Sequence, residues 1–290
     1  MKNIKKQFLS SGHNACSGCG QLSAVQAVMR GLSKDTIIAN ATGCLEVTTT
    51  AYPESAWGLP WIHSLFENAA AVASGILASL KKKGDKKTKV IVQAGDGGTF
   101  DIGLGLISGM WERGENILYI CYDTESYSNT GIQASGATPY GSATTTTPSG
   151  KQSIGSTQNK KDMLAIALAH NVKYVAQSVS GFPDDITNKV KKALTISGPS
   201  YIQILSPCIP GWKIDYGEAA AMGKLAVKTA LYPLLEYTNG QLTHSSITDN
   251  FKAEPVESYL KKQGRFKHLK PDDIKAISQI ATHNISKYKI

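Results

Sequence analysis

The stretch Lys89-Val-Ile-Val-Gln-Ala-Gly95-Asp96-Gly97-Gly98 decides the fold. Its first half is short, apolar and rich in β-branched residues, which is typical of a strand buried on both faces. The glycines that follow predict a sharp turn, and the residues from about Asp101 to Arg113 predict a helix. Ligands in open α/β sheets bind at the carboxyl ends of the strands, so this turn is a candidate ligand site.

The same alternation of short apolar strands and longer helices continues on both sides of this stretch. We expect further strands at 36–41, 116–122, 172–177 and 200–205, and further helices at 20–32, 67–83, 160–170 and 184–197. This pattern predicts an α/β fold with a mainly parallel sheet and helices on both faces. The pattern weakens after Gly211. We therefore expect one domain over 1–229 and a C-terminal arm over 230–290 that contacts another subunit.

Composition and charge limit the function classes. The longest apolar run without a charge, 69–80, is shorter than the roughly 20 residues of a membrane span, and no secretory signal is present, so we expect a soluble, cytoplasmic protein. The net charge is +9, and residues 251–290 contribute nine basic side chains against four acids. A solvated or subunit-contacting tail, or attraction of an acidic electron carrier, explains this charge better than nucleic acid, because no nucleic-acid reading motif is present.

Asp96 is a candidate ligand for a divalent cation that bridges phosphate oxygens. The glycines around it would let the backbone approach a diphosphate, next to a helix N-terminus. The strand at 116–122 should end beside Asp96, since adjacent parallel strands place their carboxyl ends at one edge. Thr124 could then offer its hydroxyl oxygen, and Ser126 its backbone carbonyl, to the same cation. The alternative is a tight turn with an acidic cap and no ligand.

The chain has five cysteines, an odd number that disfavours a disulfide framework. Cys16 and Cys19 form a Cys-x-x-Cys pair before the first helix, Cys44 follows the first strand, and Cys208 follows the last strand of the alternation. Four thiolates at strand ends could hold a zinc ion or an iron–sulfur cluster, and the spacing does not choose between them. Cys121 lies within an apolar strand and is interpreted as a core residue.

Five linked motifs, taken together, resemble the β subunit of pyruvate:ferredoxin oxidoreductases. The motifs are Gly12-His-Asn-Ala-Cys-Ser-Gly-Cys-Gly20, Ala41-Thr-Gly-Cys44, Trp61-Ile-His-Ser-Leu-Phe-Glu-Asn68, Gly95-Asp-Gly-Gly98 and Asp123-Thr-Glu-Ser-Tyr-Ser-Asn-Thr-Gly131. The resemblance covers about residues 10–215. One departure is that Asp123-Thr124 stands where the thiamine diphosphate fingerprint usually has Asn-Asn, and another is Gln21, where relatives often carry glutamate.

The resemblance implies a diphosphate-type thiamine-binding domain with three inorganic or organic cofactors. It places a [4Fe–4S] cluster on Cys16, Cys19, Cys44 and Cys208, and Mg²⁺ on Asp96, Thr124 and Ser126. It places thiamine diphosphate against Gln21, Gly43, Cys44, Gly95, Asp96, Gly97, Gly98, Thr124, Glu125, Ser126, Tyr127, Ser128 and Asn129. Asn129 looks like the residue that faces the reactive carbon, and coenzyme A is implied as co-substrate.

The implied reaction is the oxidative decarboxylation of pyruvate with coenzyme A to acetyl-CoA and CO₂, with electrons passing to ferredoxin or flavodoxin. The implied partners are an α subunit that binds the thiamine pyrimidine, a γ subunit and a ferredoxin-like δ subunit. Three alternatives stay open from the residues alone. They are another 2-oxoacid (branched-chain or oxalate) on the same scaffold, a cluster-free thiamine diphosphate lyase, and a zinc-stapled binding module whose basic tail contacts nucleic acid.

Overall fold

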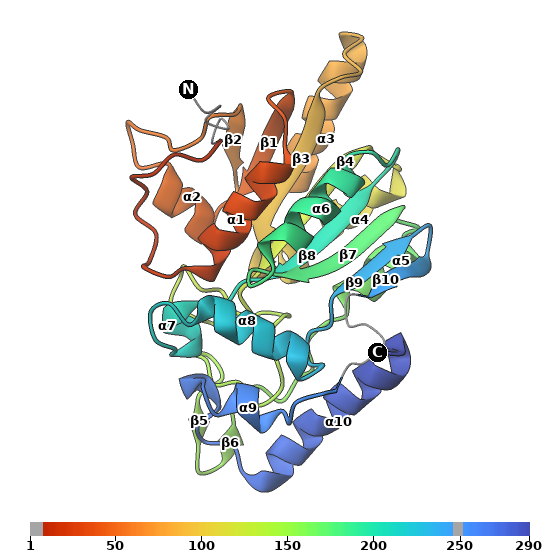
Figure 1. Cartoon of the computed structure of the whole chain (residues 1–290). Helices are drawn as coiled ribbons and strands as arrows, with labels where there is room; N and C mark the ends of the chain where they lie inside the picture. The colour runs from red at the N-terminus through yellow and green to blue at the C-terminus, as the bar shows by residue number, and fades with distance from the viewer. Residues whose placement is uncertain (1–7, 246–251) are drawn as a thin grey trace, which may run out of the picture.

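The computed structural model describes residues 8–245 and 252–290, which fold around an eight-stranded sheet (Figure 1). The strand order is β10-β9-β7-β8-β4-β3-β1-β2, and the strands from β7 to β2 in that order run parallel. The edge pair β9 and β10 runs antiparallel to its neighbours. The bounds are β1 (Thr36–Ala41), β2 (Trp61–Ser64), β3 (Lys89–Gly95), β4 (Ile117–Asp123), β7 (Tyr174–Val179), β8 (Ser200–Leu205), β9 (Leu235–Thr238) and β10 (Gln241–Ser245).

Helices cover both faces of the sheet, which explains why every residue of β4 is buried. On one face, α1 (Gly20–Gly31) and α6 (Pro183–Ala193) pack over Ile38, Ile91 and Leu118. On the other face, α3 (Ala69–Lys82), α4 (Leu104–Glu112) and α5 (Met163–Ala169) pack over Val92, Tyr119 and Val175. The predicted α/β class, with a mainly parallel sheet and helices on both faces, is therefore confirmed.

The strand order reverses between β1 and β3. From β1 the chain passes to β2 on one side, whereas β3 lies on the other side of β1 and leads on to β4. In open α/β sheets such a reversal leaves a crevice at the carboxyl ends of the two strands, where ligands bind. The segments that follow β1, β3 and β4 therefore emerge together at one edge of the sheet.

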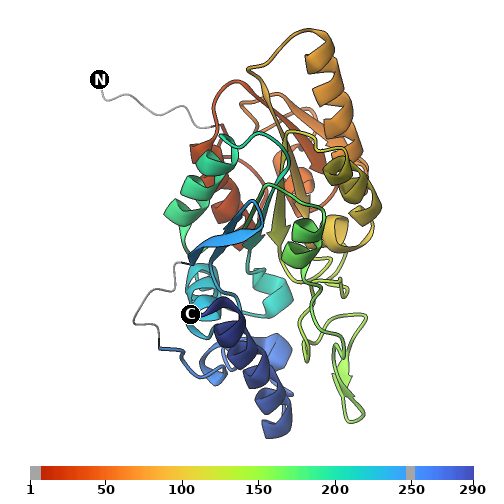
Figure 2. The same cartoon turned by 90° about the vertical axis from the view of Figure 1, so that its right-hand side faces the viewer.

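A smaller group of helices lies at this carboxyl edge, below the sheet in Figure 1. It comprises α7 (Ile209–Trp212), α8 (Ala219–Lys228), α9 (Glu257–Leu260), η2 (Gly264–Phe266) and α10 (Pro271–Tyr288). Their apolar residues share one core, which includes Trp212, Tyr259 and Phe266. The short strands β5 (Ser149–Gly150) and β6 (Ser153–Ile154) form a hairpin that projects beside these helices in Figure 2.

The C-terminal region differs from the arm expected over 230–290. Residues 235–245 join the main sheet as an edge hairpin, and residues 256–281 share a core with α7 and α8 of the same chain. The expected arm is thus part of the folded body. Its α9 and η2 are too short to show a periodic apolar pattern, and the 18-residue α10 buries only Ile277 and Ala281, so its apolar pattern is weak. Contact of this region with another subunit stays a prediction.

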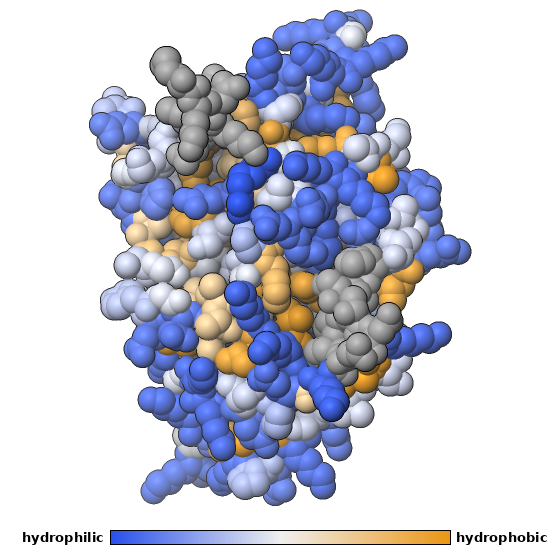
Figure 3. Space-filling view, in the orientation of Figure 1, coloured by the Kyte–Doolittle hydropathy of each residue, from blue (hydrophilic) through white to orange (hydrophobic). Residues whose placement is uncertain are grey.

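The surface is largely hydrophilic. Figure 3 shows one face covered mostly by polar residues, with hydrophobic ones in smaller patches across its middle. Within residues 8–245 and 252–290, no helix combines the length and the apolar character needed to cross a bilayer.

Candidate active site

A pocket opens at the carboxyl edge of the sheet, at the reversal between β1 and β3. Its wall is built from the residues after β1, in and before α2 (Cys44–Thr49), and from those after β3 and β4. It brings together most of the residues expected to bind the cofactor: Gln21, Gly43, Cys44, Gly95, Asp96, Gly97, Thr124, Ser126, Tyr127, Ser128 and Asn129. Residues that are far apart in sequence thus form one concave surface, as the parallel strand ends predict.

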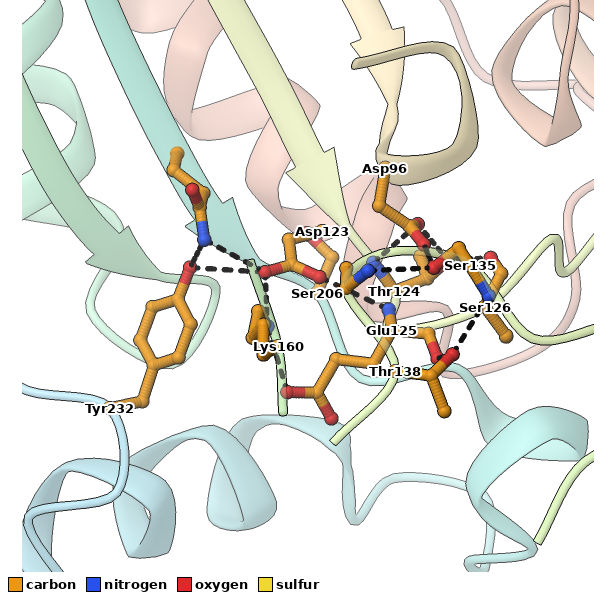
Figure 4. Close-up of polar contacts among 12 residues, drawn as sticks. Asp96, Asp123, Thr124, Glu125, Ser126, Ser135, Thr138, Lys160, Ser206 and Tyr232 are labelled. Carbon is orange, nitrogen blue, oxygen red and sulfur yellow. Dashed lines mark hydrogen bonds and ion pairs between the residues drawn. The ribbon is translucent and has the colours of Figure 1, made fainter. Parts of the chain in front are cut away.

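Two of the expected residues do not line this pocket. Gly98 is buried behind the wall, where an added Cβ would lie 3.2 Å from the carbonyl oxygen of Phe66. The Glu125 carboxylate faces away from the pocket, toward the C-terminal helices (Figure 4). The Glu125 carboxylate is paired with Lys160 and Arg265, and contact of this residue with the cofactor stays a prediction.

Asp96 lies at the centre of the polar contacts on the pocket side. Its Oδ1 accepts hydrogen bonds from the Thr124 backbone N–H at 3.1 Å and from the Thr124 hydroxyl at 2.9 Å. Its Oδ2 accepts from the Ser135 hydroxyl at 2.5 Å. The Thr124 hydroxyl oxygen is also 3.1 Å from the carbonyl oxygen of Ser126. The three residues expected to bind magnesium are therefore in mutual contact through Thr124.

The distances between these oxygens are compatible with a magnesium ion. Mg²⁺ binds oxygens octahedrally at about 2.1 Å, so neighbouring ligand oxygens lie about 3 Å apart. The Asp96–Thr124 and Thr124–Ser126 hydrogen bonds of 2.9 and 3.1 Å are close to that separation, so an ion could replace the hydroxyl proton with little movement. The donor set of one carboxylate, one hydroxyl and one carbonyl oxygen suits a hard divalent cation.

The electrostatics of Asp96 also suit a cation. Burial and the nearby charge of Asp123 raise the pKa of Asp96 to about 7. Among the residues that the structure describes, no lysine or arginine forms an ion pair with Asp96. A bound divalent cation would lower the pKa of Asp96, because its charge stabilises the carboxylate form.

Three further cysteines lie close enough to Cys44 to affect its ionisation. Cys44 lines the pocket wall itself. Burial, followed by the charges of Cys208, Cys19 and Cys16, raises the pKa of Cys44 to about 12. Burial, and to a smaller extent the charges of Cys208 and Cys16, raises the pKa of Cys19, and burial together with Cys16 raises that of Cys208. The backbone agrees with this proximity, since the Gly20 N–H donates to the Pro207 carbonyl at 3.3 Å. Cys121 is fully buried within β4, as expected of a core residue.

Zinc and an iron–sulfur cluster place different demands on the thiols. A tetrahedral zinc ion with bonds of about 2.3 Å requires its sulfurs about 3.8 Å apart. In the described part of the chain, no three His, Cys, Asp or Glu side chains form a group that could hold a metal ion. In a [4Fe–4S] cluster each cysteine sulfur binds a different iron.

Several pocket residues were not identified from the sequence. Ser135 donates to Asp96 although 39 positions separate them, and its only signal was its place in the long loop after Asp123. Asn40 and Tyr122 line the pocket from β1 and β4. The Oδ1 atom of Asn40 and the hydroxyl of Tyr122 are buried without a hydrogen-bond partner among the described residues. Such side chains are suited to contact a bound ligand.

The fold and the pocket define a thiamine pyrophosphate-binding enzyme domain. The family model for the C-terminal TPP-binding domain of thiamine pyrophosphate enzymes matches residues 41–204, the segment that runs from the end of β1 through β3, β4 and the pocket loops. The chain is similar to a solved structure of 2-oxoglutarate:ferredoxin oxidoreductase from Magnetococcus marinus with 2-oxoglutarate, coenzyme A and succinyl-CoA bound. The TM-score is 0.61 at 25% identity, covering 77% of this chain and 81% of the other.

Sequence relatives identify the family more closely. Pyruvate synthase subunit PorB of Methanosarcina barkeri is 47% identical, covering 100% of this chain and 99% of the relative. Ketoisovalerate oxidoreductase subunit VorB of Pyrococcus furiosus is 40% identical, covering 96% and 93%. The chain belongs to the family of pyruvate synthase PorB subunits, within the 2-oxoacid:ferredoxin oxidoreductases.

Proposed function

We propose that this chain is the diphosphate-binding, cluster-bearing subunit of an oxidoreductase that decarboxylates pyruvate and passes the electrons to ferredoxin or flavodoxin. The observation that carries the proposal is the set of neighbouring oxygens from Asp96, Thr124 and Ser126, in a pocket whose wall also contains Cys44. A metal-bridged diphosphate and a redox cluster would thereby share one cavity.

Each part of the pocket has a role in this proposal. Asp96, Thr124 and the Ser126 carbonyl would hold Mg²⁺ on the diphosphate, and Cys16, Cys19, Cys44 and Cys208 would hold a [4Fe–4S] cluster. When bound, thiamine diphosphate supplies the nucleophilic carbon and the cluster supplies one-electron chemistry. Leu45, Phe66 and Tyr122 would keep water from the reacting atoms. Asn129 lies exposed at the rim, where it would orient the 2-oxoacid.

Pyruvate is favoured over other 2-oxoacids by similarity. Identity to the pyruvate synthase subunit is 47%, against 40% to the ketoisovalerate subunit and 25% to the 2-oxoglutarate enzyme. The neighbour's bound coenzyme A supports coenzyme A as co-substrate. The match to the thiamine pyrophosphate enzyme family disfavours a zinc-stapled module, and the similarity to pyruvate synthase subunits disfavours a cluster-free lyase. The partners would be the α, γ and δ subunits of the oxidoreductase.

Anaerobic purification with joint quantification of iron, sulfide and thiamine tests this function. We expect iron and sulfide in equal amounts and thiamine diphosphate with magnesium in the purified complex. Each of C16S, C19S, C44S and C208S should lose most of the iron, whereas C121A should keep it, since Cys121 is a core residue. D96N should lose the thiamine and keep the iron. Stoichiometric zinc without iron would refute the proposal, and thiamine without iron would indicate the cluster-free alternative.

A further inference from the structure

In the turn after β4, the Glu125 side chain points to the side opposite that of its neighbours Thr124 and Ser126. Glu125 has a φ of 62°, in the left-handed region that residues other than glycine rarely adopt. In this conformation Thr124 and Ser126 face Asp96, while the Glu125 side chain points to the opposite side (Figure 4). Glu125 is only 5% exposed, so its carboxylate is buried on the side opposite Asp96.

Every polar atom of Glu125 has a partner. Its N–H donates to Asp123 Oδ1 at 3.1 Å, and its carbonyl accepts from the Thr138 hydroxyl at 2.8 Å. Its carboxylate accepts from Lys160 Nζ at 2.9 Å and from Arg265 Nη2 at 2.6 Å. An unfavourable backbone conformation persists only where the surroundings hold it from several directions. The four contacts meet that condition.

Several contacts besides the one with Glu125 hold the Arg265 side chain in place. It is 2% exposed, its Nε donates to Gln263 Oε1 at 2.9 Å, and its guanidinium lies 3.9 Å from the centroid of the Trp212 ring. Trp212 in turn donates from Nε1 to the Thr124 carbonyl at 3.0 Å. The C-terminal segment and α7 thus hold two successive residues of the turn from its far side.

We propose that Arg265 is a positioning residue for the metal site and that it acts through Glu125. The inference rests on the proposed function, because it presupposes that Asp96, Thr124 and Ser126 bind a cation. By holding the Glu125 carboxylate, Arg265 keeps the turn in the conformation that directs the Thr124 hydroxyl and the Ser126 carbonyl at Asp96. Without it, Glu125 can relax toward an ordinary backbone conformation, which turns the Ser126 carbonyl away.

The competing explanation is that Arg265 only fastens the C-terminal segment to the rest of the chain. In that case its loss would lower stability and leave metal affinity unchanged. The two explanations therefore differ in a readout that is independent of enzyme activity. Partners that orient metal ligands typically change metal affinity by about 10–100-fold when removed.

The test is a titration of the full-length chain, in complex with its co-purified subunits and stripped of cofactor, with Mn²⁺ and thiamine diphosphate. Free Mn²⁺ is followed by electron paramagnetic resonance. The variants are R265M, R265K, E125Q and E125Q/R265M, with D96N as the control for the site. K287M is the matched control, because Lys287 also joins the C-terminal segment to the main domain through an ion pair, with Asp162 at 2.9 Å. Thermal unfolding of each cofactor-free variant is measured in parallel.

We expect R265M to bind Mn²⁺ about 10–100-fold more weakly than the wild type, and K287M to bind it normally. R265K should recover part of the loss, because lysine keeps the charge without the planar fork, and it keeps the test valid if R265M fails to fold. The combined loss in the double variant should be smaller than the product of the two single losses, since both changes break the contact between Glu125 and Arg265.

Three results would overturn the inference. The first is normal Mn²⁺ affinity in R265M or R265K that is folded. The second is a loss of Mn²⁺ affinity in E125Q/R265M equal to the product of the losses in E125Q and R265M. The third is that the Arg265 variants lower the unfolding temperature and change nothing else. Failure of the proposed function looks different. In that case the wild type binds no Mn²⁺ with thiamine diphosphate, or D96N binds it as well as the wild type does, and both proposals fall together.

Discussion

Gly97 has no room for a side chain, and this gives a residue-scale prediction. A Cβ at this position would lie 2.3 Å from Cε1 of Tyr127, whose hydroxyl donates to Asp101 at 2.9 Å. Alanine would force the ring aside, and overpacking of this kind costs about 1–3 kcal/mol. We expect G97A to lower the free energy of unfolding by that amount, measured by urea denaturation, and to weaken thiamine diphosphate binding.

Gly105 provides the control for this change. It is an exposed residue of α4, and an added Cβ would meet nothing within 4 Å. Because alanine is favoured over glycine in a helix by about 1 kcal/mol, G105A should leave stability unchanged or raise it. If G97A and G105A behave alike, steric contact with Tyr127 is not what makes Gly97 necessary.

Single residues were predictable where a strand end placed them. Asp96 and Thr124 follow adjacent parallel strands, and they are in contact as that rule predicts. Ser135 and Arg265 were not predictable, because each reaches the site across a long sequence separation that no local pattern encodes. The direction of the Glu125 side chain was not predictable either, because it depends on a left-handed backbone conformation that no local pattern signals.

At the scale of elements, Asp162 joins two helices. Its Oδ1 accepts from the Ala165 N–H at 2.9 Å and so caps α5, while Oδ2 pairs with Lys287 of α10. Loss of such a cap costs about 1 kcal/mol, and a partly exposed ion pair contributes about 0.2–1 kcal/mol. We expect D162A to lose both contributions and D162N, which keeps a capping oxygen, to lose the smaller one. Chemical denaturation of both variants checks this order, and equal losses would contradict it.

Long, buried elements were predicted from the sequence more accurately than short or exposed ones. The strand expected at 36–41 has those bounds in the structure, because it is apolar and covered on both faces. The edge strand β2 has exposed residues at its centre and gave no apolar signal. The helix expected from about Asp101 begins instead as a short turn at Gly97–Asp101 before α4, since three glycines interrupt a regular start.

At the scale of the molecule, we propose that the pocket is one half of a larger site. Val47, Ile62 and Leu65 are 48%, 42% and 64% exposed, on α2, on β2 and just beyond β2, the elements beside the pocket. These apolar side chains would be covered by a partner subunit that docks beside the pocket. The thiamine pyrimidine, which this chain leaves unbound in our proposal, would be held by that partner.

We therefore expect the purified chain alone to show little or no oxidoreductase activity. The measurement is pyruvate- and coenzyme A-dependent reduction of ferredoxin, made anaerobically with and without the partner subunits. Activity should appear on reconstitution with the α subunit and its companions. Robust turnover by the isolated chain would contradict the division of the site between subunits.

The contact between Glu125 and Arg265 also has a consequence for biosynthesis. Arg265 belongs to the last tenth of the 290 residues, so it leaves the ribosome after the pocket loops have been made. Until then the Glu125 carboxylate lacks this partner and is held on that side by Lys160 alone. In our proposal, the turn would therefore bind its metal more weakly in a nascent chain that has not yet folded its Arg265 against Glu125.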